Sequence, residues 1–445
     1  MARGPVGAAL ASLTVRGRCM VAVGLTLLGL GALLGELPLL QVAVFVLALP
    51  LLSALGVARR RFRLSTRRTV TPTRVPRGGT ADVLLEVTNA DRRAGGLWLL
   101  TEPLPVELGP EPTYVLERLA AGTTAALHYR ASGSRRGRYR LGPLRLRLVD
   151  PFGLVTRSVT GTDAAELLVV PRVRPLAAAG PAAGVGGNGE GARRSIAVHG
   201  EDDVSTRAYR HGDDLRKVHW RATARTGELM VRLEERPWRS SATLLLDTRA
   251  RAHLIAPSGT PAAAAGEGPG DSLEWLVEAA ACIGTALTAR GAALRVLTDA
   301  GELPATDPRR GLAADELLDR LAVLQPSRRA DLSGLAELTA RAGGDGPVVA
   351  LLGAVGAADV APLTRARTGP GAGLAVLVDV GGYAATTGGA RARRSSSEAA
   401  RSALAQQREE AVVLLRDAGW RVVVARAGAP VEEAWAALTS TGVPA

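Results

Sequence analysis

The N-terminal part of the chain is dominated by two uninterrupted apolar runs. Residues 19–35 and 37–58 contain no charged side chain, and only Glu36 separates them. Each run is close to the length of about 20 residues that crosses the hydrocarbon core of a bilayer. A second full-length run directly after the first argues against a cleaved signal peptide. The pattern predicts an antiparallel pair of transmembrane helices within an N-terminal segment of residues 1–61.

Basic residues flank this pair on its outer sides and are absent from its turn. They are Arg3, Arg16 and Arg18 before the first run, and Arg59, Arg60, Arg61, Arg63, Arg67 and Arg68 after the second. Positively charged flanks stay on the cytoplasmic side of a membrane. The sequence therefore predicts a cell-membrane protein with two spans and a cytoplasmic soluble region. The second flank is also placed to bind anionic lipid headgroups of the bilayer.

A strand-like period follows over residues 62–175. Apolar and polar positions alternate in residues 81–89, 125–130 and 144–150, and Gly and Pro recur at short intervals between them. Short alternating strands with regular turn signals predict a β-sandwich-like domain. Residues 176–192 are small and Gly-rich, which predicts a flexible linker.

The C-terminal residues 237–445 alternate between apolar strand-like runs and helical patterns. The runs are residues 242–247, 293–298, 347–352, 373–380 and 421–425, and the helical patterns are residues 271–290, 312–324, 397–418 and 431–440. This order predicts an α/β domain with a doubly wound parallel sheet. Ligands of such sheets bind beyond the carboxyl ends of the strands. Asp247 and Asp379 end two strands and are therefore metal candidates, unless each only caps a loop.

Residues 193–236 concentrate histidines, carboxylates and arginines. Asp213 or Asp214 could cap a helix over residues 215–224 that ends at Gly227, and residues 228–232 favour a strand. Three interpretations compete: a metal or hydrolytic site, an anion site, and an Arg–Asp network that is structural or forms an interface. No HExxH-type ligand spacing is present. Because buried charges must be paired and the two signs are interleaved here, we favour the network.

Composition narrows the function classes further. The net charge is +13, but aromatic residues make up only 3% of the chain. Proteins that bind single-stranded nucleic acid stack bases on aromatic rings, and no nucleic-acid-binding module is recognisable, so we expect no nucleic-acid partner. The two cysteines, Cys19 and Cys282, have no metal-type or redox-type neighbours and predict no disulfide framework.

Several segments together resemble the domain of unknown function 58 family. They are residues 136–143 (RGRYRLGP), 150–154 (DPFGL), 200–207 (GEDDVSTR), 209–225 (YRHGDDLRKVHWRATAR) and 226–232 (TGELMVR). The resemblance marks as signature or interface residues Arg207, Tyr209, Arg210, Gly212, Asp213, Asp214, Arg216, His219, Trp220, Thr223 and Arg225.

The resemblance implies a C-terminal domain related to the von Willebrand factor type A domain. It also implies partnership with a MoxR-type AAA+ ATPase, and often with a transglutaminase-like membrane protein, in the assembly or maturation of other proteins. Members resemble accessory factors without an established catalytic activity, so we expect no catalytic residues and no cofactor. The alternatives are an anion-binding or hydrolytic enzyme centred on His219, Asp213 and Arg225, and a metal-dependent adhesion protein.

The metal site implied by that domain type is degenerate in this sequence. It requires the pattern D-x-S-x-S after the first strand, whereas Arg249 and Arg251 occupy both serine positions after Asp247. A guanidinium has no acceptor lone pair, and Mg²⁺ requires oxygen ligands. We therefore predict that this site holds no metal and that Asp247 is paired with an arginine.

Overall fold

The computed structural model covers residues 1–445, and the chain divides near residue 170 into two compact units. The structure describes residues 12–59, 64–91, 97–117, 119–150, 152–177, 206–209, 218, 220–232, 241–255, 271–308, 310–342, 346–367, 372–387 and 396–440. The predicted linker therefore lies outside the described residues, except for residues 176 and 177.

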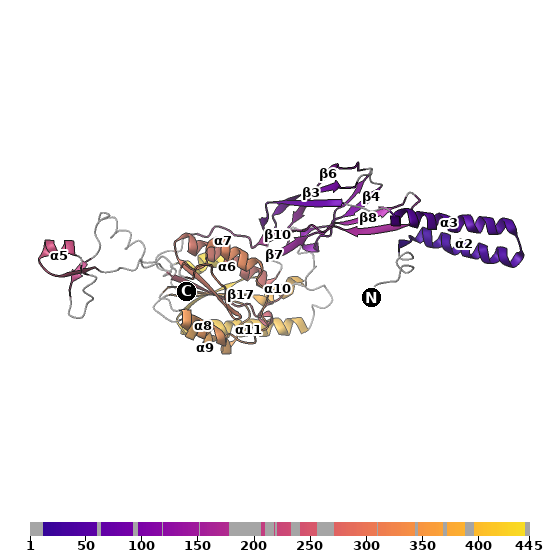
Figure 1. The fold of residues 1–445 in the computed structure, drawn as a ribbon. Coiled ribbons are helices and arrows are strands. Elements are labelled where there is room, and N and C mark those ends of the chain that lie inside the picture. Colours follow the sequence, from indigo (N-terminus) through magenta and orange to yellow (C-terminus); the bar gives the residue numbers. More distant parts are fainter. Residues whose placement is uncertain are drawn as a thin grey trace. The chain divides into compact units, whose positions relative to one another are not determined.

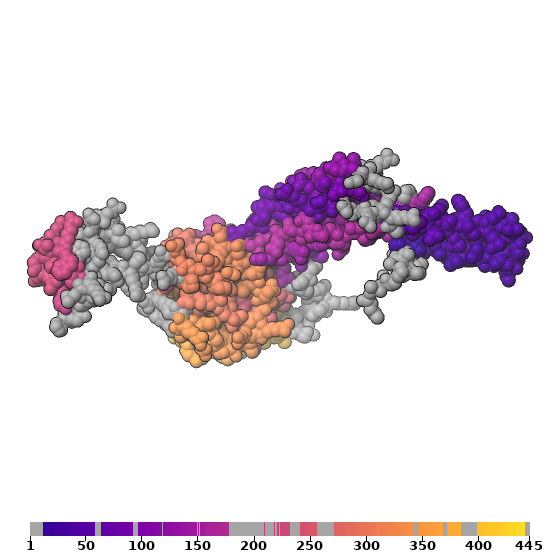
Figure 2. All heavy atoms as spheres, viewed as in Figure 1, coloured from indigo at the N-terminus to yellow at the C-terminus, as the bar shows by residue number. Residues whose placement is uncertain are grey.

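The first unit begins with a pair of long apolar helices, α2 (Val15–Leu34) and α3 (Leu37–Arg59). Both are long and apolar enough to cross a membrane by length and composition. Gly35 connects them in a left-handed conformation, with φ of 71°, which glycine adopts without strain. Figure 1 shows the pair in indigo, and Figure 2 shows it extending beyond the strands of the same unit. The first helix begins four residues before the predicted run and includes Arg16 and Arg18.

Small residues on α2 allow the two helices to approach closely. Its buried residues are Gly17, Gly24 and Gly31. A Cβ built on Gly24 would lie 2.6 Å from Leu47 Cγ, and one built on Gly31 would lie 3.1 Å from Leu40 Cδ2. Such small-residue seams are typical of helix pairs whose backbones pack tightly.

Three antiparallel or mixed sheets follow in the first unit. The first sheet contains β1 (Leu64–Thr71), β3 (Thr80–Asn89) and β6 (Thr124–Ser132). The second contains β2 (Arg74–Pro76), β10 (Ala165–Val170) and β7 (Gly137–Leu141). The third contains β5 (Thr113–Leu116), β4 (Trp98–Thr101), β8 (Arg145–Val149) and β9 (Thr156–Thr160). The three strands predicted from alternation are confirmed as parts of β3, β6 and β8. The short 3-10 helix η1 (Val106–Leu108) follows β4.

Two apolar clusters hold these sheets together. One joins the sheet of β3 to the sheet of β10, and includes Val83 and Val169. The other joins β3 to the sheet of β8, and includes Leu85, Leu148 and, from the helix pair, Val57. The helices and the strands of this unit therefore share part of one core.

The second unit contains a six-stranded sheet covered by helices. Its order is β15 (Gly301–Glu302), β14 (Ala293–Thr298), β13 (Ser241–Leu246), β16 (Val348–Leu352), β17 (Gly373–Val378) and β18 (Trp420–Ala425). All neighbours are parallel except β15, which pairs antiparallel with β14. The five predicted strands are confirmed, but the sheet is mixed rather than purely parallel. The two-residue strand β15 is too short to leave a periodic pattern.

Helices pack on both faces of this sheet. Side chains of α6 (Ser272–Ala289), α7 (Ala314–Ala322) and α12 (Val431–Thr439) share one core, and those of α8 (Ser333–Ala342), α9 (Ala357–Ala366) and α11 (Ser396–Asp417) share the other. Strand β13 contributes Leu244 and Leu246 to the first core and Leu245 to the second, as strand alternation requires. The sequence predicted α6, α7, α11 and α12 but missed α8, α9 and α10 (Val380–Thr387).

Candidate functional site

The candidate site lies where the strand order of the α/β sheet reverses, at the carboxyl ends of β13 and β16. Connections leave β13 toward β14 on one side, and the chain later returns to add β16 on the other. A crevice forms at such a switch point, and it is the usual ligand site of open α/β sheets. The residues that follow β13 here are Asp247, Thr248 and Arg249, and all three are almost completely buried.

A guanidinium fills the centre of this site. Arg249 donates from Nε to Asp247 Oδ1 and from Nη2 to Asp247 Oδ2, each at 2.9 Å, and its side chain is 1% exposed. It also donates from Nη1 to Oδ1 of Asp359, in the first turn of α9, at 2.8 Å. Bidentate charge-assisted bonds of this kind are among the strongest in proteins. One arginine therefore ties the end of β13 to the start of α9.

Electrostatics favour the charged form of this arginine. Burial of the side chain acts to lower the pKa of Arg249, but the hydrogen bonds and charges of Asp247 and Asp359 outweigh it and raise the pKa above the ordinary arginine value. Removal of the guanidinium would leave two buried carboxylates without their cation.

A second carboxylate supports the loop after β13. Asp299, which follows β14, accepts hydrogen bonds at Oδ1 from the backbone N–H and the hydroxyl of Thr248, both at 2.7 Å. The carbonyl of Thr248 in turn accepts from the N–H of Ser327 at 2.7 Å. Asp299 after β14 and Ser327 between α7 and α8 thus hold the loop, in addition to Asp359 of α9.

A buried histidine closes the other side of the loop. His253 Nε2 lies 2.8 Å from the backbone oxygen of Asp247, and Nδ1 lies 3.2 Å from Oγ of Ser272. The carbonyl can only accept, so a neutral ring donates from Nε2 and accepts at Nδ1. Burial lowers the pKa of His253 below its ordinary value, although the charge and backbone oxygen of Asp247 act in the opposite direction.

These residues do not fit a divalent cation. Arg249 occupies both carboxylate oxygens of Asp247 and the near oxygen of Asp359, which are the oxygens a cation would need. The pairing of Asp247 with an arginine is confirmed, and the partner is Arg249. The other substituted position, Arg251, is exposed at the surface. Within the described parts of the chain, no group of three or more His, Cys, Asp or Glu side chains could hold a metal ion.

The second strand-end candidate, Asp379, also has an arginine partner. It follows β17 directly, and Arg408 of α11 donates from Nη1 to its Oδ1. Both strand-end aspartates of the sequence analysis are thus ion-paired. They lie at the ends of β13 and β17, with β16 between them in the sheet.

The signature segment forms a small antiparallel unit where it is described. Strand β11 (Thr206–Ala208), which contains Arg207, pairs with β12 (Met230–Arg232), and Tyr209 donates from its N–H to the carbonyl of Leu229 at 2.7 Å. Between the strands, Thr223 accepts at Oγ1 from the N–H of Met230 at 3.0 Å. The hydroxyl of Thr223 thus fixes the helix α5 (Trp220–Thr226) to β12.

The predicted helix of this segment begins too early. Residue Val218 forms an isolated bridge with Val231, so it belongs to extended chain rather than to a helix over 215–224. The helix ends before Gly227, as predicted, with φ of 77° at that glycine. On α5, Trp220 is 71% exposed and Arg225 is exposed in the last turn. The remaining signature residues lie outside the described residues: Arg210, Gly212, Asp213, Asp214, Arg216 and His219.

Sequence reasoning missed three residues of the strand-end site. Asp299 ends the run ALRVLTD in the same way that Asp247 ends its own run, so that signal was available. Asp359 lies in a helix that was not predicted, and His253 follows a short 3-10 helix, η4 (Ala250–Ala252). No local pattern distinguishes either residue from a surface polar position.

Both cysteines are free, and neither joins this site. Cys19 is exposed on α2, and Cys282 is buried in α6. The Sγ of Cys282 accepts from the N–H of Arg174 at 3.3 Å, and burial raises the pKa of this thiol to about 11. The thiol is therefore a packing and hydrogen-bonding group that attaches residues near 172–174 to α6.

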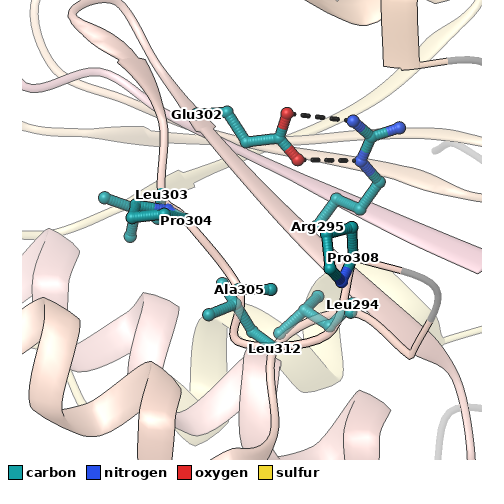
Figure 3. A pocket seen from close by; sticks show the side chains of 9 residues that line it. Leu294, Arg295, Glu302, Leu303, Pro304, Ala305, Pro308 and Leu312 are labelled. Carbon is teal, nitrogen blue, oxygen red and sulfur yellow. Dashed lines mark hydrogen bonds and ion pairs between the residues drawn. The ribbon is translucent and has the colours of Figure 1, made fainter.

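A pocket of about 320 Å³ lies beside the edge strand β15 and its neighbour β14 (Figure 3). Its wall is mostly apolar, with Leu294, Leu303 and Leu312 among the lining residues. Arg295 and Glu302 form a bidentate ion pair across it, at 2.9 Å for both bonds. Since each charge is already satisfied by the other, the pocket presents no free polar group from this pair.

These features define a class of protein: two N-terminal apolar helices, β-sheets in the middle, and a C-terminal mixed parallel sheet with helices and an internally paired strand-end cluster. The family model described as "Protein of unknown function DUF58" matches residues 205–343, which span the chain from β11 to the end of α8. The match confirms, over this segment, the resemblance drawn from the signature.

No curated protein matches the chain. Among solved structures, the CARDB domain of the PF1109 protein from Pyrococcus furiosus is 16% identical, covering 25% of this chain and 96% of its own, with a TM-score of 0.19. The putative ApaA protein from Bordetella pertussis is 11% identical (24% and 94% covered, TM-score 0.19). The alkylpurine DNA glycosylase AlkC from Pseudomonas fluorescens is 14% identical (30% and 40% covered, TM-score 0.18). TM-scores this low support no conclusion about this chain.

Proposed function

We propose that this protein is a membrane-anchored, non-enzymatic accessory protein whose cytoplasmic α/β domain binds a partner protein. The observation that carries the proposal is the apolar outer surface of the helix pair. Large apolar side chains stand exposed along both helices, among them Leu25, Leu33, Val44, Phe45 and Leu51. A soluble protein rarely exposes so large a contiguous apolar surface, and a bilayer would cover it.

The basic flanks set the orientation of the proposed anchor. Arg16 and Arg18 lie exposed at the start of α2, and Arg67 lies in β1 shortly after α3. The helix–helix turn contains no Lys or Arg. By the charge rule for membrane topology, the strands of the first unit and the whole α/β unit would lie on the cytoplasmic side.

For the α/β unit, the proposal is a von Willebrand factor type A-like domain that works without a metal. Its sheet order, with an antiparallel edge strand β15 and a reversal at β13, is compatible with that domain type. The bonds from Arg249 to Asp247 and Asp359 give the strand-end loops a fixed internal cation. The β-strands between helix pair and α/β unit would form a β-sandwich-like spacer, since two facing pairs of sheets share apolar cores.

The partner we propose is a MoxR-type AAA+ ATPase, with the signature segment as the contact surface. This partner comes from the family resemblance, and a transglutaminase-like membrane protein is a further candidate. One described feature supports an interface role for the signature segment. Trp220 is largely exposed on α5, and exposed tryptophans are enriched among the residues that dominate binding energy at interfaces.

Capture of the ATPase from membranes tests the proposal. The full-length protein and its Trp220→Ala variant are purified from gently solubilised membranes, and the recovered proteins are identified by mass spectrometry. We expect an AAA+ ATPase with the parent protein and a marked loss with Trp220→Ala. Val323→Ala, at another exposed apolar side chain, is the matched control and should recover the ATPase normally. Recovery of no AAA+ ATPase at low and moderate salt would count decisively against this partner.

Membrane anchoring and orientation are tested separately. Alkaline carbonate should leave the protein in the membrane pellet, because the helix pair rather than a peripheral contact holds it. Protease added to intact spheroplasts should not digest the α/β unit, whereas protease added to inverted vesicles should. Extraction into the supernatant would contradict the anchor, and digestion in intact spheroplasts would contradict the orientation.

A further inference from the structure

The turn between β8 and β9 is described at residues 150 and 152–155, and it contains the family-like motif of residues 150–154, which the proposed function does not use. Asp150 organises it from within: its Oδ1 accepts from the N–H of Val155 at 2.6 Å and its Oδ2 from the N–H of Phe152 at 3.2 Å. Gly153 adopts φ of 70° and donates to the carbonyl of Asp150 at 2.9 Å. The turn is thus internally bonded, and its aromatic residue points outward, with Phe152 61% exposed.

This turn is bound directly to the start of helix α2. Thr14, the N-cap of α2, donates from its N–H to the carbonyl of Leu154 at 2.9 Å and from its hydroxyl to the carbonyl of Gly153 at 2.6 Å. Leu13 forms an antiparallel bridge with Val155. Gly17 packs so closely that a Cβ built on it would lie 2.3 Å from the Leu154 oxygen. Only a glycine allows this approach without a shift of the backbone.

The neighbouring strand is bound to the end of helix α3. Arg157 of β9 donates from Nη1 to the carbonyl of Val57 at 3.3 Å. Val57 itself belongs to the apolar cluster that contains Leu148, Leu154 and Val155. The turn and its strands therefore contact the cytoplasmic ends of both helices.

These contacts fix the depth of the turn relative to a bilayer. An α-helix rises by about 1.5 Å per residue, so Gly17 lies roughly 3 Å before Cys19, where the charge-free run begins. Val57 is the penultimate residue of the second charge-free run, residues 37–58. Both attachment points thus lie at the boundary between the apolar runs and the charged flanks. In a membrane this is the level of the headgroups and the first acyl carbons.

We propose that this turn is a membrane-surface contact in which Phe152 enters the interfacial layer of a bilayer with anionic headgroups. The inference rests on the membrane anchoring proposed above. Two features favour a lipid surface as the contact of this turn. The turn is continuous with the apolar exterior of the helices, and positively charged side chains lie near it. Among the described residues near these attachment points, Arg16, Arg18 and Arg157 are exposed. An aromatic ring with cations beside it is the composition that binds the interface of anionic membranes.

The consequence is that the strands of the first unit are held at the membrane surface by lipid as well as by the helices. The lipid contact would add to the bonds from Thr14 and Arg157, which already attach these strands to the helices. The alternative is that Phe152 contacts the surface of a partner protein instead of lipid.

Tryptophan probes in full-length protein reconstituted into anionic-lipid nanodiscs test the proposal. Phe152→Trp is compared with Phe45→Trp on the exposed face of α3 and with Val106→Trp in η1. Val106 is 66% exposed and flanks Leu104 and Leu108, which belong to the apolar cluster that contains no helix-pair residue. The fluorescence of the introduced tryptophan is obtained for each variant by subtracting the fluorescence of the parent protein. It is measured with ordinary lipids and with lipids that are brominated near the start of the acyl chain.

We expect the brominated lipids to reduce the fluorescence of the introduced tryptophan in Phe152→Trp and Phe45→Trp and to leave that in Val106→Trp unchanged. Loss for Phe45→Trp without loss for Phe152→Trp would overturn the proposed contact and leave the anchor standing. No loss for Phe45→Trp would instead contradict the anchor itself. Equal loss for Val106→Trp and Phe152→Trp would overturn the specific placement of the turn.

Hydroxyl-radical labelling of the parent protein in the same nanodiscs provides a second measurement without substitution. The oxidation rate of each residue is divided by the rate expected from its intrinsic reactivity and its exposed surface. We expect this ratio to be lower for Phe152 than for Val106. Full oxidation of Phe152 in nanodiscs would overturn the proposal even if a tryptophan variant failed to fold.

Discussion

Arg249 donates two hydrogen bonds of 2.9 Å to the carboxylate of Asp247, which lies two residues earlier in the chain. The same guanidinium reaches Asp359, which is 110 positions away in sequence. The strand end that would bind a ligand in other open α/β sheets is therefore occupied by the protein's own cation.

Loss of the guanidinium should strongly destabilise the α/β unit. Arg249→Ser leaves Asp247 and Asp359 buried without a counter-charge, and removal of one partner of a buried ion pair typically costs about 3–5 kcal/mol. Arg295→Ser is the matched control because Arg295 pairs with Glu302 at a partly exposed edge, where such pairs contribute about 1 kcal/mol or less. Urea denaturation of both variants measures the difference. Similar midpoints for the two variants would contradict the role assigned to Arg249.

Divalent cations should not bind the strand-end site of the natural protein. Calorimetric titration with Mg²⁺ or Mn²⁺ should give no binding heat, because the oxygens of Asp247 already accept from Arg249. The double variant Arg249→Ser, Arg251→Ser restores hydroxyl ligands after Asp247, and we expect it to gain binding and to melt at a higher temperature with Mn²⁺ present. Binding by the natural protein that disappears in Asp247→Ala would prove our assignment wrong.

The α/β unit should lose stability below about pH 6.5, the ordinary pKa of histidine. Burial lowers the pKa of His253 in the folded protein, so the unfolded chain binds a proton first as the pH falls. The stabilisation is therefore complete above the unfolded pKa and declines as the pH falls toward the folded one. Thermal melting between pH 8 and pH 5 should show this decline, and His253→Gln should reduce it. His128→Gln removes an exposed imidazole on β6, outside the α/β unit, and serves as the control.

A side chain at Gly17 should loosen the attachment of the β8–β9 turn to α2. Gly17→Ala brings a Cβ within 2.3 Å of the Leu154 oxygen, so the helix or the turn must shift, and overpacking of this kind costs about 1–3 kcal/mol. Hydrogen exchange at the N–H of Thr14, which donates to Leu154, should become faster. Gly29→Ala in the same helix meets nothing within 4 Å and should leave this exchange rate unchanged. Equal rates in the two variants would argue against a close contact at Gly17.

Much of the architecture could be predicted from local pattern alone. The charge-free runs 19–35 and 37–58 correspond to α2 and α3, and the apolar runs 293–298 and 347–352 correspond to β14 and β16. These elements are predictable because burial or length forces a long, regular pattern on the sequence. Short elements leave no such pattern: β15 has only two residues, and α9 contains Pro362, which argues against a helix.

The strand-end site shows where local pattern stops being informative. The sequence determined that Asp247 ends a strand and that arginines replace the serines after it, so an Arg–Asp pair could be expected. It could not show that Arg249 rather than Arg251 turns inward, or that Asp299, Asp359 and His253 converge on the same loop. Similarly, the motif at residues 150–154 was visible, but its contact with Thr14 and Gly17 was not. Such contacts depend on how distant segments meet in space, and only packing of the whole sheet or helix pair decides which side chains come together.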